Sequence, residues 1–140
     1  MLFPKKVKHR KWQTGRQGAH KQNRPDTRGI TVAFGSHGLK ALTTKRVRSN
    51  QIEAARKAMS RHMGKLGRSW IRIFPDRPFT KKPSEVKMGK GKGDLQGYEF
   101  EVHPGRIIFE VDGLPDEQAK EALRKAGTKL PVKTKVVTRQ

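Results

Sequence analysis

Four acidic side chains lie close together in the sequence and are the best candidates for catalysis. Glu99 and Glu101 are two residues apart, and Glu110 and Asp112 follow after a turn. Carboxylates bind Mg²⁺, a bound metal can activate water for phosphodiester hydrolysis, and His103 could serve as a base. The same acids alternate with apolar residues, however, as on the solvent face of a half-buried strand. We therefore keep a metal-dependent nuclease as the alternative and expect no catalytic residue, no metal site and no cofactor.

A serine-hydrolase arrangement is a weaker candidate. Ser36 and His37 are neighbours between Gly35 and Gly38. Neighbours in sequence rarely form a triad, and the sequence places no orienting acid beside them. The absence of cysteine excludes disulfides, thiol catalysis and Cys/His zinc sites. We interpret this segment as a turn.

A glycine- and lysine-rich loop, expected over residues 77–93, is the strongest candidate for binding. Its candidate binding residues are Lys81, Lys82, Lys87, Met88, Gly89, Lys90, Gly91, Lys92 and Gly93. Glycine lets a backbone approach a phosphate closely, and the lysines between the glycines supply positive charge. The spacing matches neither a P-loop nor a dinucleotide-binding fingerprint. A mobile surface loop is the alternative, but we favour a loop that follows an RNA backbone because long loops in compact domains are often functional.

The first 29 residues form a second basic segment, which we treat as an arm. Its candidate RNA-binding residues are Lys5, Lys6, Lys8, Arg10, Lys11, Trp12, Arg16, Lys21 and Arg24. Asp26 is the single acid, and no helical or strand period persists. Such a segment cannot offset its ordering entropy with apolar burial, so we expect it to order along phosphates. A frayed terminus is the alternative.

A helix face and several aromatic side chains are further candidates. Lys57, Arg61 and Lys65 are spaced four residues apart, so they line up on one side of the expected first helix. This side is either a phosphate-contacting face or an ordinary solvated one. Trp12 is the best candidate to stack on an unpaired base, whereas Trp70, Phe74 and Tyr98 fit a core equally well.

The charge balance points to a polyanionic partner. The chain has 140 residues, with 33 Lys and Arg against 12 Asp and Glu, which gives a net charge of +21. Repulsion among these charges destabilises the folded state of a free protein, so the charge is better explained by a partner that neutralises it. Nucleic acid is the leading partner, because phosphate neutralisation releases counterions. No stretch is both basic and rich in bulky apolar residues, so we expect no membrane binding. The hydrophobic share of 32% limits the core to a small one.

Apolar spacing predicts two helices. The first begins near Ser49 or Asn50, where Asn50 and Glu53 resemble a capping box. Its predicted buried stripe is Ile52, Ala55, Met59, Met63 and Leu66. The second begins with Pro115 in its first turn. Its apolar stripe is Ala119, Ala122, Leu123 and Ala126, and Gly127 comes just after its end.

Alternating residues predict the strands. Residues 30–34 and 70–74 are β-type runs, and residues 132–138 form a last strand. Residues 98–102 and 107–111 flank a type II turn at Pro104-Gly105 and are expected to pair as a hairpin. We predict an α+β fold of order β-α-β-β-α-β, with two helices on one face of a small mixed or antiparallel sheet. The arm, 1–29, would precede a single domain over 30–140.

Seven blocks, spread nearly end to end, resemble one protein family. They are MLFPKK (1–6), AFG (33–35), QIEAAR (51–56), WIRIFPD (70–76), MGKGKG (88–93), PGR (104–106) and KLPVKTK (129–135). In this combination and order they resemble the bacterial-type family of large-subunit ribosomal protein sixteen. One departure is Lys87, where the family usually has arginine, because lysine lacks the planar, bidentate guanidinium.

The resemblance implies a structural protein and no enzyme. It implies binding to large-subunit (23S-type) ribosomal RNA near the peptidyl-transferase region, and contact with neighbouring ribosomal proteins and A-site tRNA, with P-site tRNA as a further candidate. It also implies a role in subunit assembly and translation. The expected location is a bacterial ribosome in the cytoplasm, or an organelle ribosome if the protein is made there. A free RNA-binding or chaperone-like protein is the alternative within the same class.

Overall fold

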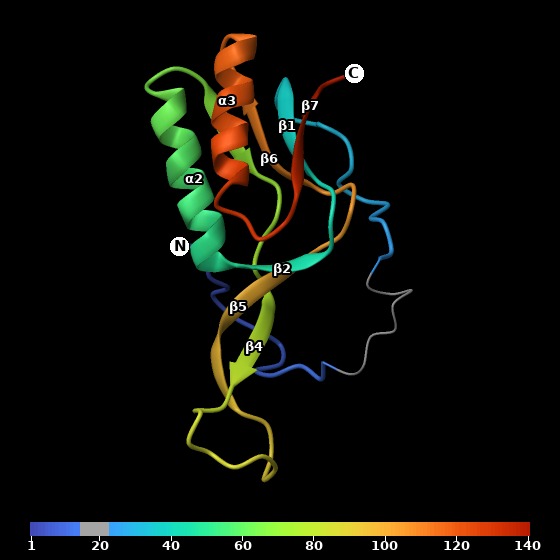
Figure 1. Cartoon of the computed structure of the whole chain (residues 1–140), viewed down its shortest axis with the longest axis vertical. Coiled ribbons are helices and arrows are strands. Elements are labelled where there is room, and N and C mark those ends of the chain that lie inside the picture. Colours follow the sequence, from blue (N-terminus) through green and yellow to red (C-terminus); the bar gives the residue numbers. More distant parts are fainter. Residues whose placement is uncertain (15–22) are drawn as a thin grey trace.

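The computed structural model describes residues 1–14 and 23–140, which contain seven strands and two helices. Figure 1 shows the α+β arrangement that the sequence predicts. The elements are β1 (His37–Ala41), β2 (Lys45–Arg48), α2 (Ser49–Met63), β3 (Arg68–Ile71), β4 (Arg77–Lys81), β5 (Asp94–Val102), β6 (Ile107–Asp112), α3 (Asp116–Gly127) and β7 (Thr134–Thr138).

The strands form two antiparallel sheets instead of the one expected. The larger sheet has the order β3-β6-β1-β7, and the smaller has the order β2-β5-β4. Figure 1 shows α2 and α3 side by side against the larger sheet, while β4 and β5 extend away from it as a two-stranded ribbon. The core lies between the helices and the larger sheet, where Leu39, Phe109 and Leu123 are fully buried.

Both helices form because small and apolar side chains recur at helical spacing. In α2, Ile52, Ala55, Met59 and Met63 are buried, as predicted. Two details differ. Leu66 lies beyond the helix, which ends at Gly64 with φ +65°, and it is 66% exposed.

The predicted capping box is also wrong in its residues. The side chain of Gln51 accepts a hydrogen bond from the backbone N–H of Arg48 (2.9 Å), while Glu53 instead pairs with Arg56 (2.6 Å). In α3 the predicted stripe of Ala119, Ala122, Leu123 and Ala126 is buried. Pro115 precedes this helix, and Gly127 is its last residue.

The predicted hairpin between residues 98–102 and 107–111 is wrong. β5 pairs with β2 and β4, whereas β6 pairs with β1 and β3. The turn itself exists: Gly105 has φ +97°, and the N–H of Arg106 donates to the carbonyl of His103 (3.3 Å). The turn connects the smaller sheet to the larger one. The alternating apolar residues before it therefore belong to β5 in the smaller sheet, and those after it belong to β6 in the larger sheet.

Two more segments differ from their predictions. Residues 30–34 form no strand, and the first strand is β1. The loop expected at 77–93 is shorter, because residues 77–81 are strand β4 paired with β5. The arm meets the body before its expected end: Asp26 N–H donates to the carbonyl of Pro104, and the carbonyl of Gly29 accepts from Ile107 N–H.

Candidate nucleic-acid interface

The loop 82–93 projects from the end of the β4–β5 ribbon, at the far end of the molecule from the C-terminus of the chain (Figure 1). Lys87, Lys90 and Lys92 are exposed, and Met88 is 93% exposed. Lys81, on the last residue of β4, is exposed as well, while Lys82 is half-buried and donates to the carbonyl of Gly89. The structure therefore gathers the loop candidates on one protruding element.

The glycines of this loop are required by its backbone. Gly89 and Gly91 have φ +95°, and Lys90 between them has φ +57°. Three successive residues with positive φ are strained for residues that carry a Cβ, so glycine at two of them makes the turn accessible. A Cβ on Gly89 or Gly91 would meet no atom within 4 Å. The turn encloses an open cavity of about 510 Å³ between Lys82, Lys87 and Lys92.

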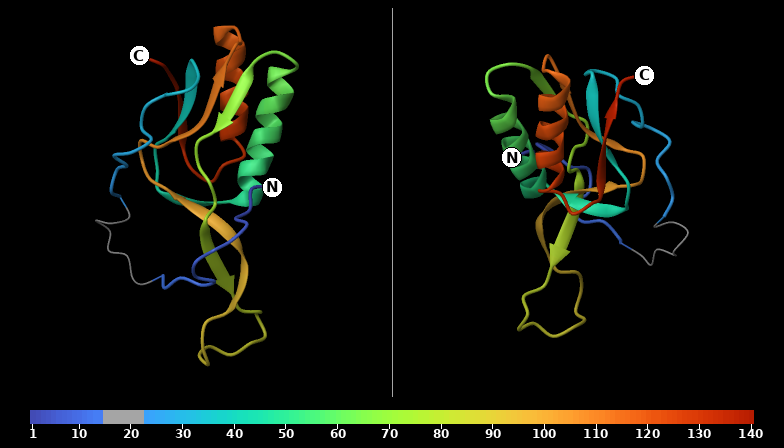
Figure 2. Two further views of the ribbon diagram at one scale, coloured as in Figure 1. Left: turned by 180° about the vertical axis from the view of Figure 1, so that it is seen from behind. Right: turned by 45° about the horizontal axis from the view of Figure 1, so that its top comes forward.

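The first part of the arm, residues 1–14, lies against the smaller sheet. The ring of Phe3 packs edge-on against Tyr98 of β5, with centroids 5.0 Å apart, and Leu2 packs against the core. Further along, the guanidinium of Arg77 on β4 lies 5.6 Å from the centre of the Trp12 ring. Figure 2 shows this segment beside β4 and β5. The arm thus adds its cations to the flank of the ribbon that carries the loop.

The arm candidates fall into three groups. Lys5, Lys6, Lys8 and Arg10 are exposed, and Lys11 is half-buried. Arg24 is exposed. Arg16 and Lys21 lie outside the described residues. Trp12 is 40% exposed, so part of its ring is covered by its contact with Arg77.

The helix candidates lie elsewhere. Lys57 and Arg61 are exposed on α2, and within the described residues neither forms an ion pair. Figure 1 shows α2 beside α3, away from the loop at the end of the ribbon. The cationic face of α2 and the loop 82–93 are therefore two separate surfaces.

Comparisons with known proteins identify the family of the chain. The family model described as "Ribosomal protein L16p/L10e" matches residues 4–137. The chain belongs to this ribosomal protein family. It is 55% identical over 140 residues to the large ribosomal subunit protein uL16 of Maricaulis maris, covering 99% of the chain and 98% of the relative.

Two further relatives have the same name. The large ribosomal subunit protein uL16 of Vibrio cholerae is 51% identical, with 100% of the chain and 98% of the relative covered. That of Parabacteroides distasonis is 54% identical, with 100% of the chain and 94% of the relative covered. The L16p/L10e family consists of structural ribosomal proteins, so the protein is a ribosomal protein and not an enzyme.

The acids that formed the nuclease alternative are separated by the fold. Glu110 lies on β6 in the larger sheet, whereas Glu99 and Glu101 lie on β5 in the smaller one. Glu99 pairs with Arg46 (3.5 Å), and Glu101 pairs with Arg77 (3.4 Å). Within residues 1–14 and 23–140 no group of acids and histidines is placed to hold a metal ion. The hairpin that could have brought Glu110 opposite Glu99 and Glu101 does not form.

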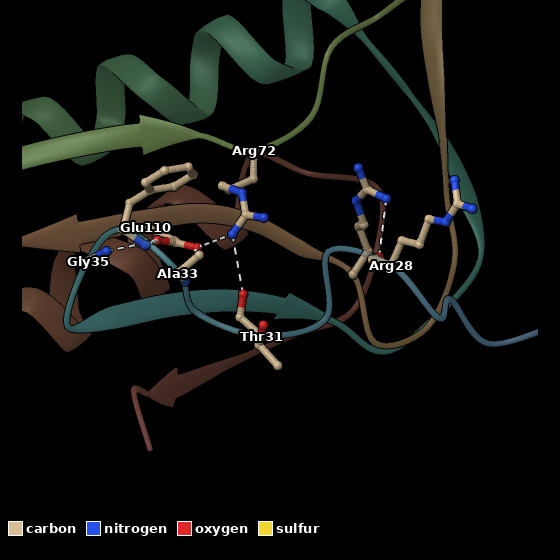
Figure 3. Close-up of polar contacts among 8 residues, drawn as sticks. Arg28, Thr31, Ala33, Gly35, Arg72 and Glu110 are labelled. Atoms are coloured by element: carbon tan, nitrogen blue, oxygen red, sulfur yellow. Dashed lines mark hydrogen bonds and ion pairs between the residues drawn. The ribbon is translucent and has the colours of Figure 1, made fainter.

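Glu110 instead anchors a segment of backbone. Its carboxylate accepts hydrogen bonds from the N–H groups of Ala33 (3.0 Å), Phe34 (2.6 Å) and Gly35 (2.8 Å), and it pairs with Arg72 (Figure 3). Arg72 also donates to the carbonyl of Thr31 (3.3 Å). These contacts explain why residues 30–34 form no strand, because the N–H groups of Ala33 and Phe34, like that of Gly35, donate to one carboxylate.

The pKa of Glu110 reflects this environment. Burial by itself raises the pKa of the carboxyl, which is 0% exposed. The hydrogen bonds from the three N–H groups and from Arg72 outweigh burial, so the pKa lies below its ordinary value of 4.5. The carboxylate is therefore held ionised inside the protein. Glu110, the one acid between the apolar residues Ile107 and Val111, was the sequence signal for such a buried, paired charge.

The second enzyme candidate also needs a correction, because the fold does place an acid beside His37. Asp116 Oδ1 lies 2.6 Å from His37 Nε2, and Ser36 Oγ lies 2.9 Å from His37 Nδ1. Ser36 also donates to the carbonyl of Val111 (3.4 Å). This chain of contacts joins the start of β1 to the start of α3, and in a ribosomal protein it serves to connect these elements.

Within the part of the chain that the structure describes, no helix is long and apolar enough to cross a membrane.

Proposed function

We propose that this protein is a structural constituent of the large ribosomal subunit and binds large-subunit (23S-type) ribosomal RNA. Its arm and its loop 82–93 contact RNA phosphates near the peptidyl-transferase region, and the loop contacts A-site tRNA, with P-site tRNA as the next candidate. Neighbouring ribosomal proteins are its other partners. It supports subunit assembly and translation in the cytoplasm of a bacterium, or in an organelle that makes it.

The observation that carries this proposal is the placement of the loop. Its exposed lysines and positive-φ glycines sit at the tip of a two-stranded ribbon that leads away from the core. A narrow cationic element can enter a space between RNA helices that the broader body cannot. Lysines supply charge for any phosphate, so sequence selectivity would come from RNA shape rather than from this loop.

The arm supports the same proposal from the side of the ribbon. Leu2 and Phe3 attach its beginning to the body, which leaves Lys5, Lys6 and Lys8 exposed beside β4 and β5. Because the start of the arm is already attached to the body, the arm loses less conformational entropy when its lysines bind phosphates. The arm would then contribute most to ribosomal RNA affinity.

Sedimentation distinguishes a fixed ribosomal place from free RNA binding. A native lysate is fractionated on a density gradient at low and at high salt, and the protein is quantified across it. We expect about one copy per large subunit that resists the salt wash, because many partly buried contacts act together. Substoichiometric, salt-labile association would contradict the proposal and favour the free RNA-binding alternative.

Charge-neutral variants test the role of the loop. Lys87→Gln, Lys90→Gln and Lys92→Gln together keep the length and the glycines of the loop but remove three charges. We expect A-site tRNA binding to reconstituted ribosomes to fall more than incorporation of the variant into subunits. Both are measured on the same purified particles, by tRNA filter binding and by quantitative mass spectrometry.

The matched control removes the same charge from the other candidate surface. Lys57→Gln, Arg61→Gln and Lys65→Gln alter exposed residues at α2 and just beyond it. We expect this variant to bind A-site tRNA like the unchanged protein. Equal losses in the two triple variants, or parallel loss of incorporation and tRNA binding in the loop variant, would contradict the assignment of tRNA contact to the loop.

A further inference from the structure

Three side chains, those of Arg68, Trp70 and Arg72, lie in a row on one face of β3 and the residue that follows it. Arg68, Trp70 and Arg72 alternate along extended backbone, and Arg72 N–H donates to the carbonyl of Ile108 (2.8 Å), so the pairing with β6 continues past Ile71. Side chains two residues apart on a strand are about 6.6–6.8 Å apart. That spacing is close to twice the thickness of an aromatic ring, so one planar group can lie between each pair.

The gap at Trp70 and Arg72 is already used by Phe34. Its ring is stacked on Trp70, with centroids 6.2 Å apart and an interplanar angle of 22°. The guanidinium of Arg72 lies 5.1 Å from the centre of the same ring. Phe34 is held there by the hydrogen bonds of residues 33–35 to Glu110. The protein itself thus demonstrates how a planar group is accommodated on this strand.

The next gap, between Arg68 and Trp70, is an open cavity of about 310 Å³. Its remaining lining residues are Gly67, Gly113 and Asp112. A Cβ on Gly113 would lie 3.2 Å from Gly67 Cα, so the two glycines make a floor without side chains. Arg68 and Asp112 are cross-strand partners and both are exposed. Among the described residues neither side chain has an ion-pair partner.

We infer that this slot, between Arg68 and Trp70, binds one unpaired guanine base of RNA, an inference that rests on the proposed function. An indole on one side and a guanidinium on the other stack on a planar base from both faces. Asp112 accepts hydrogen bonds through two oxygens, and guanine is the base that presents two adjacent N–H donors, N1–H and N2–H. Adenine and cytosine offer one amino group each beside an acceptor nitrogen, which an aspartate repels.

Charge favours a nucleotide over an apolar protein side chain in the slot. The chain as a whole carries +21, and the exposed Arg68 lines the slot beside Trp70. A phosphate beside an extruded base would lie near this cation, whereas an aromatic protein side chain would bring no negative charge. The cavity is at the small end of ligand sites, which suits a single base.

The test uses Trp70 as its own reporter. The chain has two tryptophans, and Trp12→Phe leaves Trp70 as the single one. This full-length variant is titrated at physiological salt with short single-stranded RNAs that carry one guanine, one adenine or one cytosine among uracils. Stacking on the indole quenches its fluorescence. We expect saturable quenching, with an apparent Kd for the guanine RNA about tenfold below those of the others.

A second substitution tests the role of the carboxylate. Asp112→Asn, in the same background, should reduce the preference for guanine to about threefold or less while quenching persists. The matched control is Asp76→Asn, another exposed aspartate that lies outside the slot and should leave the preference unchanged. Both substitutions are at exposed positions, so folding is preserved, and this is verified by circular dichroism.

Each remaining outcome overturns one specific statement. If no RNA quenches Trp70 while the same protein still binds large-subunit ribosomal RNA, the slot is not a base site and the proposed function stands. If all bases quench equally, or if Asp112→Asn leaves the preference intact, the assignment to guanine is wrong. If large-subunit ribosomal RNA itself does not bind, the proposed function fails along with the inference.

Discussion

The segment at residues 33–35 and the loop 82–93 use similar residues in opposite ways. Both depend on glycine and on charge. In the first, a Cβ on Gly35 would lie 2.4 Å from the carbonyl oxygen of Val111, and the central charge, Glu110, is fully buried and paired. In the second, Gly89 and Gly91 have open space around them, and the lysines are exposed. Buried, paired charge stabilises the fold, whereas exposed charge on a tolerant backbone is available to a partner.

Removal of the buried carboxylate should have the largest effect. Glu110→Ala leaves Arg72 and three backbone N–H groups without their acceptor, so we expect the free energy of unfolding to fall by about 3–5 kcal/mol. Urea denaturation followed by circular dichroism measures this. Glu121→Ala, which removes an exposed partner of Arg124, is the control and should change stability little. Similar effects of the two variants would remove the distinction between buried and exposed charge.

A methyl group should separate the two kinds of glycine. Gly35→Ala places its Cβ against backbone that cannot move easily, and we expect a loss of about 1–3 kcal/mol in the free energy of unfolding. Gly91→Ala meets no neighbouring atom and carries the cost of a positive φ alone, about 1 kcal/mol. Thermal and urea unfolding of the pair provide the comparison. A greater loss for Gly91→Ala would show that the loop is more tightly coupled to the body than its exposure indicates.

Acid should weaken the buried network around Glu110. The folded pKa of Glu110 is below 4.5, so the unfolded chain takes up this proton first as the pH falls. The contribution of Glu110 is fully present above its unfolded pKa and is lost as the pH falls through its lower folded pKa. We expect the unfolding free energy of the unchanged protein to decline over this acidic window. Glu110→Gln should decline less steeply, and parallel curves would contradict the assignment.

The loop substitutions should have the smallest effect on stability. Lys87→Gln, Lys90→Gln and Lys92→Gln together should leave the free energy of unfolding unchanged, because these side chains are exposed and lie outside the core. The same variant should reduce the salt dependence of ribosomal RNA binding, by a slope of about 0.7–0.9 per lysine that contacts a phosphate. Binding isotherms over a salt series measure the slope. An unchanged slope would mean that the loop lysines do not contact phosphates.

The helices and the α+β class could be predicted because they follow from local spacing. Ile52, Ala55, Met59 and Met63 face one side of any helix that contains them, and glycine ends that helix. The charge of the loop was equally visible, since it depends on composition alone. Strand pairing is different. The alternation in residues 98–102 and 107–111 fits a hairpin as well as it fits two separate sheets, and only the distant strands β1, β2, β3 and β4 decide between them.

The slot beside Trp70 could not be predicted for the same reason. Arg68 and Asp112 are far apart in the sequence and meet only because β3 pairs with β6 in one register. The stacking of Phe34 on Trp70 could not be predicted either, because it depends on the Glu110 carboxylate, which fixes the position of residues 33–35. A hydrogen bond between a backbone N–H and a side chain far away in the sequence does not change the local pattern of apolar and polar residues.

The position of β1 in its sheet has a consequence for biosynthesis. Its neighbours are β6, which begins at Ile107, and β7, which begins at Thr134, so β1 has no partner strand until most of the chain has been synthesised. The same holds for residues 33–35, whose acceptor is Glu110. Contacts this distant make folding a late, slow step. The basic N-terminal segment therefore leaves the exit tunnel well before the body can fold, and RNA or a chaperone can reach it first.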